Sequence, residues 1–457
     1  MMAIEKNRNY VLDITGMTHE GQGVGRIEAL AVFVEGALEG EQVEVRITKL
    51  KSTYAVGKLV TVLRSSDHRV DAFCSVYSRC GGCSLQHMDY SAQLDFKTKL
   101  VRDNLVRLGG LKDVVVNNAI GMRQPFNYRN KAQYPLARRD GNVITGFYAA
   151  RSHAVISSEK CGIQDIQSDK VRGIVRQFIA DKGITVCDET SGKGLVRHVA
   201  TRIGFNTREV MVVLVINGSM LPAVEELVKR LITAVPETKS IFLNSNTENT
   251  NVILGKINTC VYGSDTITDT IGKYKFQISP HSFFQINPVQ TEVLYSKALE
   301  YAALTGAETV FDLYCGIGTV SLFLSAKAGK VYGVEVVEEA IADARKNAEL
   351  NGADNVEFIA GEAEKVVPEL YKQGICADVV VLDPPRKGCD ETLLRLLSEM
   401  QPKRIVYISC NPATLARDLK FLDGQGYRVV EVQPVDMFPW TRHVECIVLI
   451  TRSESRM

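Results

Sequence analysis

Hydrophobic and polar residues alternate with a period of two over residues 10–64, in stretches such as YVLDI, LAVFVEG, EQVEVRI and TYAVGKLVTVL. Glycine-rich breaks at GQGVGR and EGALEGE separate these stretches. The pattern is typical of short β-strands joined by tight turns, and it predicts a small five-stranded barrel. Barrels of this size often bind nucleic acid, although a purely structural module would have the same pattern.

The pattern changes twice along the rest of the chain. Residues 66–275 mix a cysteine-rich stretch, a basic helix-like segment (SAQLDFKTKLVRDNLVRLGG), a helix at 221–234 and strands at EVMVVLVING and SIFLNSNT. From residue 288 onward, helical segments alternate with apolar strand-like segments, which predicts a parallel α/β sheet. We therefore divide the chain into a barrel (1–65), a central α+β domain (66–275) and a C-terminal α/β domain (276–457).

Seven strands are predicted in the C-terminal domain. In chain order they are TVFDLY, KVYGVEV, NVEFI, ADVVVLD, RIVYIS, YRVVEVQPV and HVECIVLI. Because no helix separates the last two, we expect an antiparallel closing strand.

Composition narrows the class of protein. The 457 residues carry a net charge of +1 and are 45% hydrophobic, with no apolar run near the roughly 18 residues of a membrane span. The N-terminal stretch MMAIEKNRNY lacks the apolar segment of a secretory signal. We expect a cytoplasmic protein without a membrane partner, and nothing in the composition demands more than a monomer. Near-neutral charge excludes a generally polycationic nucleic-acid binder, so any nucleic-acid surface has to be local.

A glycine loop follows the first strand of the C-terminal domain, in FDLYCGIGTVSL. The strand runs into Gly316 and Gly318 and then into a helix, and Glu335 ends the next strand, where it can accept hydrogen bonds from ribose hydroxyls. A dinucleotide fingerprint fits loosely, because GIGTVS lacks the third glycine. S-adenosylmethionine has no pyrophosphate, and Asp312 before the loop suits its sulfonium group. The loop therefore favours a methyltransferase over an iron-sulfur oxidoreductase that binds a dinucleotide.

The fourth strand ends in VVVLDPPRKGCDE, which places Asp383 at the crevice where open α/β sheets bind ligands. Enzymes that methylate exocyclic base nitrogens have an aromatic ring after the two prolines. Arg386 stands at that position here, which disfavours that chemistry. Cys389 follows a Lys-Gly pair, and it fits either an incidental thiol or a nucleophile.

A second thiol, Cys410, lies directly behind the fifth strand in VYISCNPATLARDL. Free cysteines are often buried for packing alone. A nucleophilic role is also open, because C5 of uracil attacks a methyl sulfonium only after a thiolate has added to C6. A base must afterwards remove the C5 proton. Glu445 in RHVECIVLI is the candidate, since burial in an apolar strand would raise its pKa, whereas an edge carboxylate in solvent would have no such role.

Four other cysteines form a candidate metal site. CSVYSRCGGC supplies Cys74, Cys80 and Cys83, and Cys161 in SSEKCGI is the nearest fourth ligand. Eleven cysteines in a chain with no visible signal peptide favour metal-binding or catalytic thiols over disulfides. Four thiolates suit tetrahedral zinc or an iron-sulfur cluster, and the spacing alone leaves both open.

The segment FNYRNKAQYPLARRDG interleaves aromatic and basic side chains. They are Phe126, Tyr128, Tyr134, Arg129, Lys131, Arg138 and Arg139. Aromatic faces can stack on unpaired bases while the cations meet phosphates, although a solvated hairpin would have the same composition.

Five blocks together carry a resemblance: SFFQIN, DLYCGIGT, DPPRKG, ISCNPATLARDL and DMFPWTRHVE, in this order. They resemble the signature blocks of the RNA uracil-5-methyltransferase family over nearly the full chain, and the barrel resembles the TRAM domain of its ribosomal-RNA members. The resemblance implies a class I, Rossmann-like methyltransferase domain. It also implies transfer of a methyl group from S-adenosylmethionine to C5 of a uridine flipped out of structured RNA.

The resemblance also assigns roles. Cys410 would be the nucleophile and Glu445 the proton acceptor. The cofactor contacts would be Gln285, Tyr314, Glu335 and Asp383. The family often has Asn after the third strand, where Glu362 stands here, so the adenine contact departs from the pattern.

The four cysteines resemble the family's 4Fe-4S site, and we expect the cluster to organise the central domain and its RNA face. The expected substrate is 23S ribosomal RNA, with transfer RNA as the alternative. A non-catalytic RNA-binding protein on a methyltransferase fold is the alternative of a different class.

Overall fold

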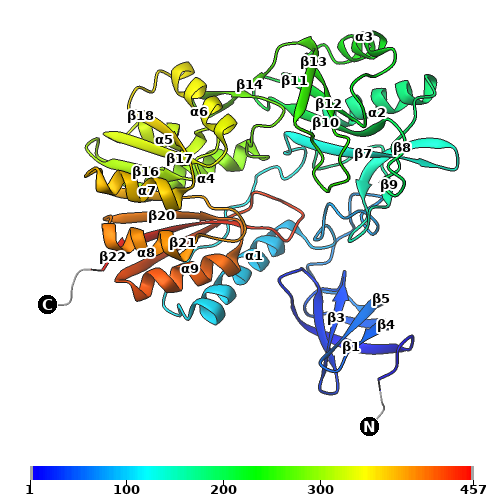
Figure 1. Ribbon diagram of the computed structural model, residues 1–457. Helices are drawn as coiled ribbons and strands as arrows, with labels where there is room; N and C mark the ends of the chain where they lie inside the picture. Colours follow the sequence, from blue (N-terminus) through cyan, green and yellow to red (C-terminus); the bar gives the residue numbers. More distant parts are fainter. Residues whose placement is uncertain (1–3, 454–457) are drawn as a thin grey trace.

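The computed structural model describes residues 4–453 of the chain (Figure 1). The first body of the structure is a closed β-barrel. Its strands pair in the order β1-β2-β3-β5-β4. Their bounds are β1 (Asn9–Met17), β2 (Gly23–Ile27), β3 (Leu30–Glu35), β4 (Gln42–Leu50) and β5 (Tyr54–Arg64). Alternate residues point inward, so that Val43, Val45 and Ile47 of β4 are fully buried. The predicted five-stranded barrel is confirmed.

The second body is a seven-stranded sheet with the order β13-β12-β11-β10-β7-β8-β9. Its strands are β7 (Lys131–Arg139), β8 (Asn142–Tyr148), β9 (Val155–Ser157), β10 (Val196–Ile203), β11 (Val210–Ile216), β12 (Thr238–Ser245) and β13 (Ile257–Gly263). Helices α2 (Ile166–Asp181) and α3 (Val224–Ala234) pack on one face, where Val212 and Leu214 of β11 lie. Met211 and Val213 point to the other face, into the core that the central sheet shares with the C-terminal domain. Both faces of β11 are thus covered, which explains its uninterrupted apolar sequence.

The third body is an eight-stranded sheet with the order β18-β17-β16-β19-β20-β22-β21-β6. Its strands are β6 (Val115–Val116), β16 (Thr309–Leu313), β17 (Lys330–Glu335), β18 (Val356–Ala360), β19 (Val379–Leu382), β20 (Arg404–Ser409), β21 (Tyr427–Val435) and β22 (Glu445–Arg452). The first five strands in the spatial order run parallel, and β22 lies antiparallel between β20 and β21. The expected parallel α/β sheet and its antiparallel closing strand are confirmed.

Helices cover both faces of this sheet. One face carries α4 (Pro288–Ala302), α5 (Thr319–Ser325), α6 (Glu338–Leu350) and the hairpin of β14 (Ile267–Ile271) and β15 (Tyr274–Ile278). The other face carries α7 (Ala363–Lys372), α8 (Glu391–Met400) and α9 (Pro412–Gly424). No helix within residues 4–453 is both long and apolar enough to cross a membrane.

One helix from the first quarter of the chain packs against the third body. Helix α1 (Tyr90–Asn104) and the π-helical turn η1 (Leu105–Gly109) lie against α9, and β6 pairs with β21 at the edge of the sheet (Figure 1). Val101 and Leu105 are buried in the same core as the sheet. Residues 90–116 therefore complete the third body, although they precede the central sheet in sequence.

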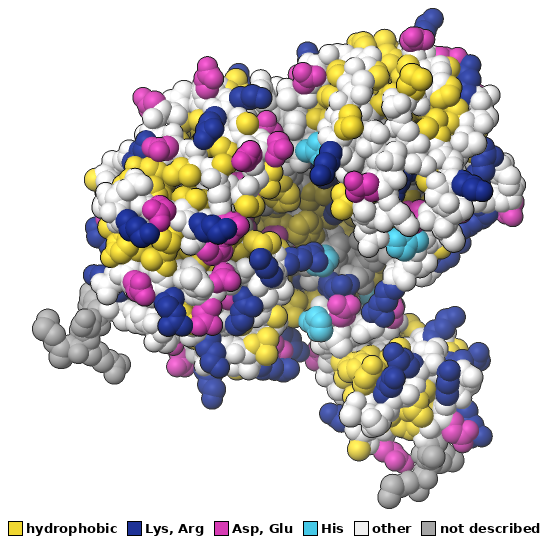
Figure 2. All heavy atoms as spheres, in the orientation of Figure 1, with side chains coloured by type: hydrophobic (Ala, Val, Ile, Leu, Met, Phe, Trp, Pro, Cys, Tyr) yellow, Lys and Arg dark blue, Asp and Glu magenta, His cyan; other side chains and the backbone are white. Residues whose placement is uncertain are grey.

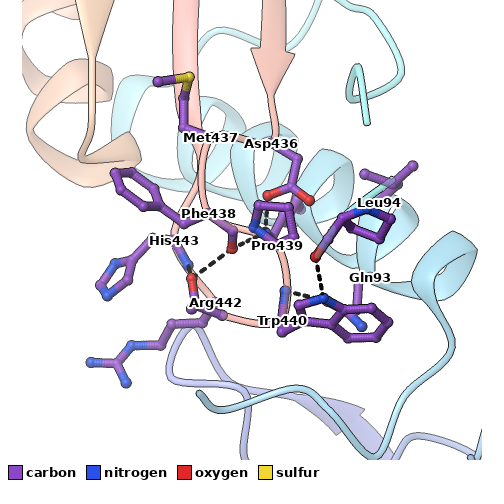
Figure 3. Close-up of polar contacts among 12 residues, drawn as sticks. Gln93, Leu94, Asp436, Met437, Phe438, Pro439, Trp440, Arg442 and His443 are labelled. Atoms are coloured by element: carbon purple, nitrogen blue, oxygen red, sulfur yellow. Dashed lines mark hydrogen bonds and ion pairs between the residues drawn. The ribbon is translucent and has the colours of Figure 1, made fainter. Parts of the chain in front are cut away.

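A buried ion pair fixes the loop between β21 and β22 to α1. The ammonium of Lys97 contacts the carboxylate of Asp436, and both side chains are wholly buried. Asp436 also accepts a hydrogen bond from the Tyr90 hydroxyl at 2.8 Å. Further along the loop, the backbone N–H of Trp440 donates to the side chain of Gln93 at 3.0 Å (Figure 3). Three side chains of one helix thus hold residues 436–440.

We expect Lys97→Met to destabilise the protein by about 3–5 kcal/mol, because it leaves the carboxylate of Asp436 buried without its counter-ion. Urea unfolding followed by the fluorescence of the single tryptophan, Trp440, measures the effect next to the change. Lys99→Met is the matched control, since Lys99 lies one helical half-turn away in an exposed pair with Glu39 and should change stability little. Equal midpoints for the two variants would contradict the expectation.

Candidate active site

The glycine loop lies between β16 and α5, as the sequence predicts. Gly318 begins α5 with φ of 80°, and a Cβ there would meet the ring of Phe358 at 2.7 Å, so only glycine fits. At the end of β17, the carboxylate of Glu335 accepts hydrogen bonds from the backbone N–H groups of Gly316 at 3.2 Å and Val337 at 3.0 Å. These contacts fix the carboxylate at the mouth of the loop.

Two acidic side chains lie near this loop, Asp312 in β16 and Asp383 just after β19. Asp312 is fully buried; one carboxylate oxygen accepts from the Ser321 hydroxyl, and within residues 4–453 the other has no partner. Burial raises the pKa of Asp312 to about 7. Burial, with the charge of Asp312 adding to it, also raises the pKa of Asp383 to about 7. A buried oxygen without a donor and a second carboxyl nearby suit a positively charged ligand, as the sulfonium of S-adenosylmethionine is.

The other expected cofactor contacts lie around the same loop. Tyr314 has φ of 69°, a strained value for a non-glycine residue, and its hydroxyl donates to Glu364 at 3.1 Å. Gln285 is 8% exposed, and its backbone carbonyl accepts from the Asn130 side chain at 2.9 Å. Glu362 lies exposed at the start of α7 in an ion pair of 3.0 Å with Lys365.

The sheet register brings the two expected reactive side chains together. Ser409, the last residue of β20, lies opposite Cys446 of β22. Because the two strands are antiparallel, the residue after β20, Cys410, lies beside Glu445, the first residue of β22. Glu445 is only 5% exposed, so it is the buried carboxylate of the two alternatives.

The electrostatics of this pair follow from burial, from the interaction of the two groups and from two neighbouring charges, Asp383 and Arg386. Burial raises the pKa of Glu445 well above its usual range, Asp383 raises it further, and Arg386 opposes the shift. Burial raises the pKa of the Cys410 thiol to about 11; Glu445 and Asp383 add to this, and Arg386 again opposes it. Arg386 is thus the cation that favours the ionised forms of both groups.

Cys410 opens into a groove of about 850 Å³. The groove is lined by the first hairpin of the barrel, by α1 and η1, by the start of α9 and by residues 442–444. Figure 2 shows the molecule hollowed between its two larger bodies, with Lys, Arg and His side chains gathered at the margin nearest the barrel. The barrel thus shares one surface with the thiol of Cys410.

Cys389 lies apart from this groove. It is 5% exposed within the hydrophobic core, and its backbone N–H donates to Asp418 at 2.9 Å. Burial raises the pKa of its thiol to about 12, with the hydroxyl of Tyr407 opposing the shift and the charge of Asp418 adding to it. A protonated thiol inside the core fits the packing alternative.

The four cysteines of the candidate metal site lie in one region, but they are not close enough together to coordinate a metal ion. Burial raises the pKa of Cys83 to about 12, and Cys161, Cys80 and Cys74 each add to that shift. The backbone N–H of Gly82 donates to the sulfur of Cys80 at 3.4 Å. Within residues 4–453, however, no three His, Cys, Asp or Glu side chains are grouped closely enough to hold a metal ion. The donor set suits a thiolate-bound group, and its ligand geometry is not formed.

This cysteine loop touches the loop before Glu445. The backbone N–H groups of Ser84 and Leu85 both donate to the carbonyl of Trp440 at 3.0 Å. Cys83 and Cys161 pack against the cluster that contains the Trp440 ring. The candidate metal site therefore adjoins the loop that leads into the strand of the candidate base.

The expected RNA contacts divide by exposure. Tyr128 and Tyr134 are buried, and the Tyr128 hydroxyl donates to the carbonyl of Pro439, so neither ring is free to stack on a base. Phe126 is 46% exposed and packs beside the rings of Phe73 and Trp440.

The four cations of this segment also differ. Arg138 and Arg139 are exposed, and each donates to backbone carbonyls of the central body. Lys131 and Arg129 are half-buried, and burial lowers the pKa of Lys131 to about 8, with Arg202 and Arg129 contributing. Within this segment, the exposed Arg138 and Arg139 are therefore the cations most open to a nucleic acid.

Sequence reasoning missed two side chains that line the groove, Arg442 and His443. Figure 3 shows both pointing away from the Trp440 ring, on the far side of the loop from α1. The signal was the tripeptide TRH, which stands directly before the last strand in DMFPWTRHVE.

Comparisons with known proteins agree with this geometry. Residues 258–453 match the tRNA (uracil-5-)-methyltransferase family, and residues 5–60 match the TRAM domain. An uncharacterized RNA methyltransferase of Caldanaerobacter subterraneus is 51% identical over 452 residues, which cover 99% of this chain and 100% of the relative. One from Clostridium tetani is 52% identical over 448 residues, 98% of this chain and 97% of the relative.

A solved structure extends the likeness to the whole fold. The crystal structure of Pyrococcus abyssi tRNA (uracil-54, C5)-methyltransferase with S-adenosyl-L-homocysteine superposes with a TM-score of 0.77 at 29% identity, covering 96% of this chain and 99% of that one. The full-length relatives, the matched domains and this superposition agree. The chain belongs to the RNA (uracil-5-)-methyltransferase family and is an S-adenosylmethionine-dependent enzyme with an N-terminal TRAM domain.

Proposed function

We propose that this enzyme methylates C5 of a specific uridine in 23S ribosomal RNA through a covalent bond between Cys410 and C6 of the base. The observation that carries the proposal is the register that sets Cys410 beside the buried Glu445, at the end of a groove reaching the TRAM barrel. A flipped uridine can enter this groove while the RNA backbone stays outside.

Cys410 acts first. Its sulfur forms a bond to C6, the electrons of the C5–C6 double bond move to C5 and O4, and the thiol proton is lost to solvent. Because the thiol has a pKa of about 11, the positive charge of Arg386 matters at this step, where it stabilises the developing negative charge.

S-adenosylmethionine, when bound, supplies the methyl group that C5 takes up. Glu335 and Asp383 would hold it with the glycine loop, and Gln285 and Tyr314 would complete the contacts. The carboxylate of Glu445 then takes the proton from C5. The C6–sulfur bond breaks, the C5–C6 double bond forms again, and Cys410 is released.

We also propose that Cys74, Cys80, Cys83 and Cys161 hold a 4Fe-4S cluster. The four-thiol donor set and the N–H directed at the Cys80 sulfur support this assignment. No step of the methyl transfer needs an electron, so the cluster would support the fold. Its loop contacts Trp440, and the expected RNA contacts Phe126, Arg129, Lys131, Arg138 and Arg139 follow it in the same body; the buried Tyr128 is not one of them.

Transfer RNA is the second candidate substrate. The superposed Pyrococcus abyssi enzyme is named for uridine 54 of tRNA, and its match covers the barrel as well as the methyltransferase body. The ribosomal assignment is supported by the resemblance of the barrel to the TRAM domain of ribosomal-RNA members.

Incubation with S-adenosylmethionine and RNA carrying 5-fluorouridine should leave a denaturation-resistant protein–RNA complex. Fluorine cannot leave C5 as a cation, so the covalent bond to Cys410 persists. Cys410→Ala should form none, and Cys389→Ala, a change at the core thiol, should form as much as wild type. Ribosomal and transfer RNA fragments offered in parallel identify the substrate. A complex that survives in Cys410→Ala would refute the proposed nucleophile.

Glu445→Gln should lower turnover by about 10²–10⁴-fold, because an amide cannot take the C5 proton. It should accumulate a covalent complex with ordinary, unfluorinated RNA, in which C5 already carries the methyl group. Gel electrophoresis under denaturing conditions with radiolabelled methyl donor detects that complex. Loss of turnover without any labelled complex would show that Glu445 acts before methyl transfer.

Anaerobic reconstitution should load about four iron and four sulfide ions per chain, with visible absorbance that Cys83→Ser loses. Chelation should loosen RNA binding before it affects formation of the Cys410 complex. Cys187→Ser, a change at a half-buried thiol outside the group, is the control and should keep full loading. One zinc ion in place of iron would assign the site to zinc.

A further inference from the structure

A single carboxylate of the barrel connects the three bodies of the molecule. Glu20, in the hairpin between β1 and β2, lies 3.2 Å from the guanidinium of Arg442 and 3.6 Å from that of Arg151. Arg442 belongs to the loop before Glu445, and Arg151 belongs to the turn between β8 and β9 of the central body. The carboxylate is therefore shared by two arginines that come from different bodies.

The tip of the β1–β2 hairpin packs closely against Leu85 and Arg442. Gly21 has φ of 79°, and a Cβ there would meet the side chain of Leu85 at 3.0 Å and that of Arg442 at 4.0 Å. The backbone N–H of Arg442 donates to the Ser84 hydroxyl at 3.0 Å. Arg442 is thus held from the cysteine loop and approached closely by the barrel.

The position of this contact ties it to the reactive thiol. Glu20, Arg442 and Cys410 line the same groove. The Arg442 side chain is 35% exposed and that of Glu20 is 33% exposed, so both meet solvent there. Figure 3 shows Arg442 pointing away from the buried side of its loop.

Paired guanidinium groups are also phosphate ligands. Carboxylate and phosphate accept the same charge-assisted hydrogen bonds from arginine, and a phosphodiester carries the same single negative charge. A uridine flipped toward Cys410 must bring its flanking phosphates to the mouth of this groove. The anion that belongs beside Arg442 during the reaction is then a phosphate of the RNA.

We propose that Arg442 and Arg151 form a binding site for a backbone phosphate next to the target uridine, and that Glu20 occupies this site until RNA displaces it. The inference rests on the proposed function, because it places the phosphate relative to a uridine at Cys410. Displacing Glu20 breaks its ion pairs with both arginines. The apparent affinity is therefore lower for an RNA that makes few other contacts with the enzyme. The barrel would thereby help to reject short or unstructured RNA.

The direction in which one substitution changes the affinity for RNA tests this proposal. Glu20→Gln should bind fluorescein-labelled oligouridylate about two- to tenfold more tightly in fluorescence anisotropy, because two exposed ion pairs no longer compete with the phosphate. Glu44→Gln is the matched control, since it removes the same charge from the same barrel at a position outside the groove and should change affinity little.

Arg442→Gln should weaken binding and reduce the slope of log affinity against log salt by about 0.7, the value for one phosphate contact on a single strand. Glu20→Gln added to Arg442→Gln should bring a smaller gain than in the wild type, since the competition has lost one partner. Thermal unfolding by circular dichroism checks that each variant is folded.

Unchanged or weaker binding by folded Glu20→Gln would overturn the inference and make Glu20 a structural tether of the barrel. An unchanged salt slope in Arg442→Gln would do the same for the phosphate site. The wild-type 5-fluorouridine complex keeps this separate from the proposed function. If that complex does not form while the affinities change as expected, the phosphate site is supported and the proposed chemistry at Cys410 is refuted.

Discussion

The buried pair between Lys97 and Asp436 is the contact on which the arrangement of the active site depends. Two charges removed from water require each other, because either one alone would be left uncompensated in the core. The pair joins a helix near residue 97 to a loop near residue 436, and that loop leads into Glu445. The position of the candidate base is therefore set by a helix from the first quarter of the chain.

The same loop collects contacts from every body of the molecule. Its Trp440 carbonyl accepts two hydrogen bonds from the cysteine loop, and its Arg442 meets Glu20 of the barrel. Arg442 and Glu20 themselves line the groove with Cys410. The cysteine loop and the barrel therefore both contact residues 440–442, a few positions before Glu445.

The sequence predicted the parts of this molecule that depend on local pattern. The barrel, the parallel sheet and the glycine loop with Glu335 follow from residue periodicity and turn chemistry, and all are present. The pairing of β6 with the sheet and the packing of α1 against the loop depend on contacts between residues more than 300 positions apart. Residue periodicity does not predict such contacts. Tyr128 shows the same limit, since an aromatic among cations suggests stacking on bases until burial is known.

The acidic groups of the crevice connect cofactor charge to the strength of the base. Burial and Asp383 both raise the pKa of Glu445, and Asp312 in turn raises that of Asp383. A positive charge held beside these groups, such as a sulfonium, would oppose both shifts and lower the pKa values of Glu445 and Asp383. The ionisation of the two carboxyl groups would therefore depend on whether a bound cofactor carries a positive charge.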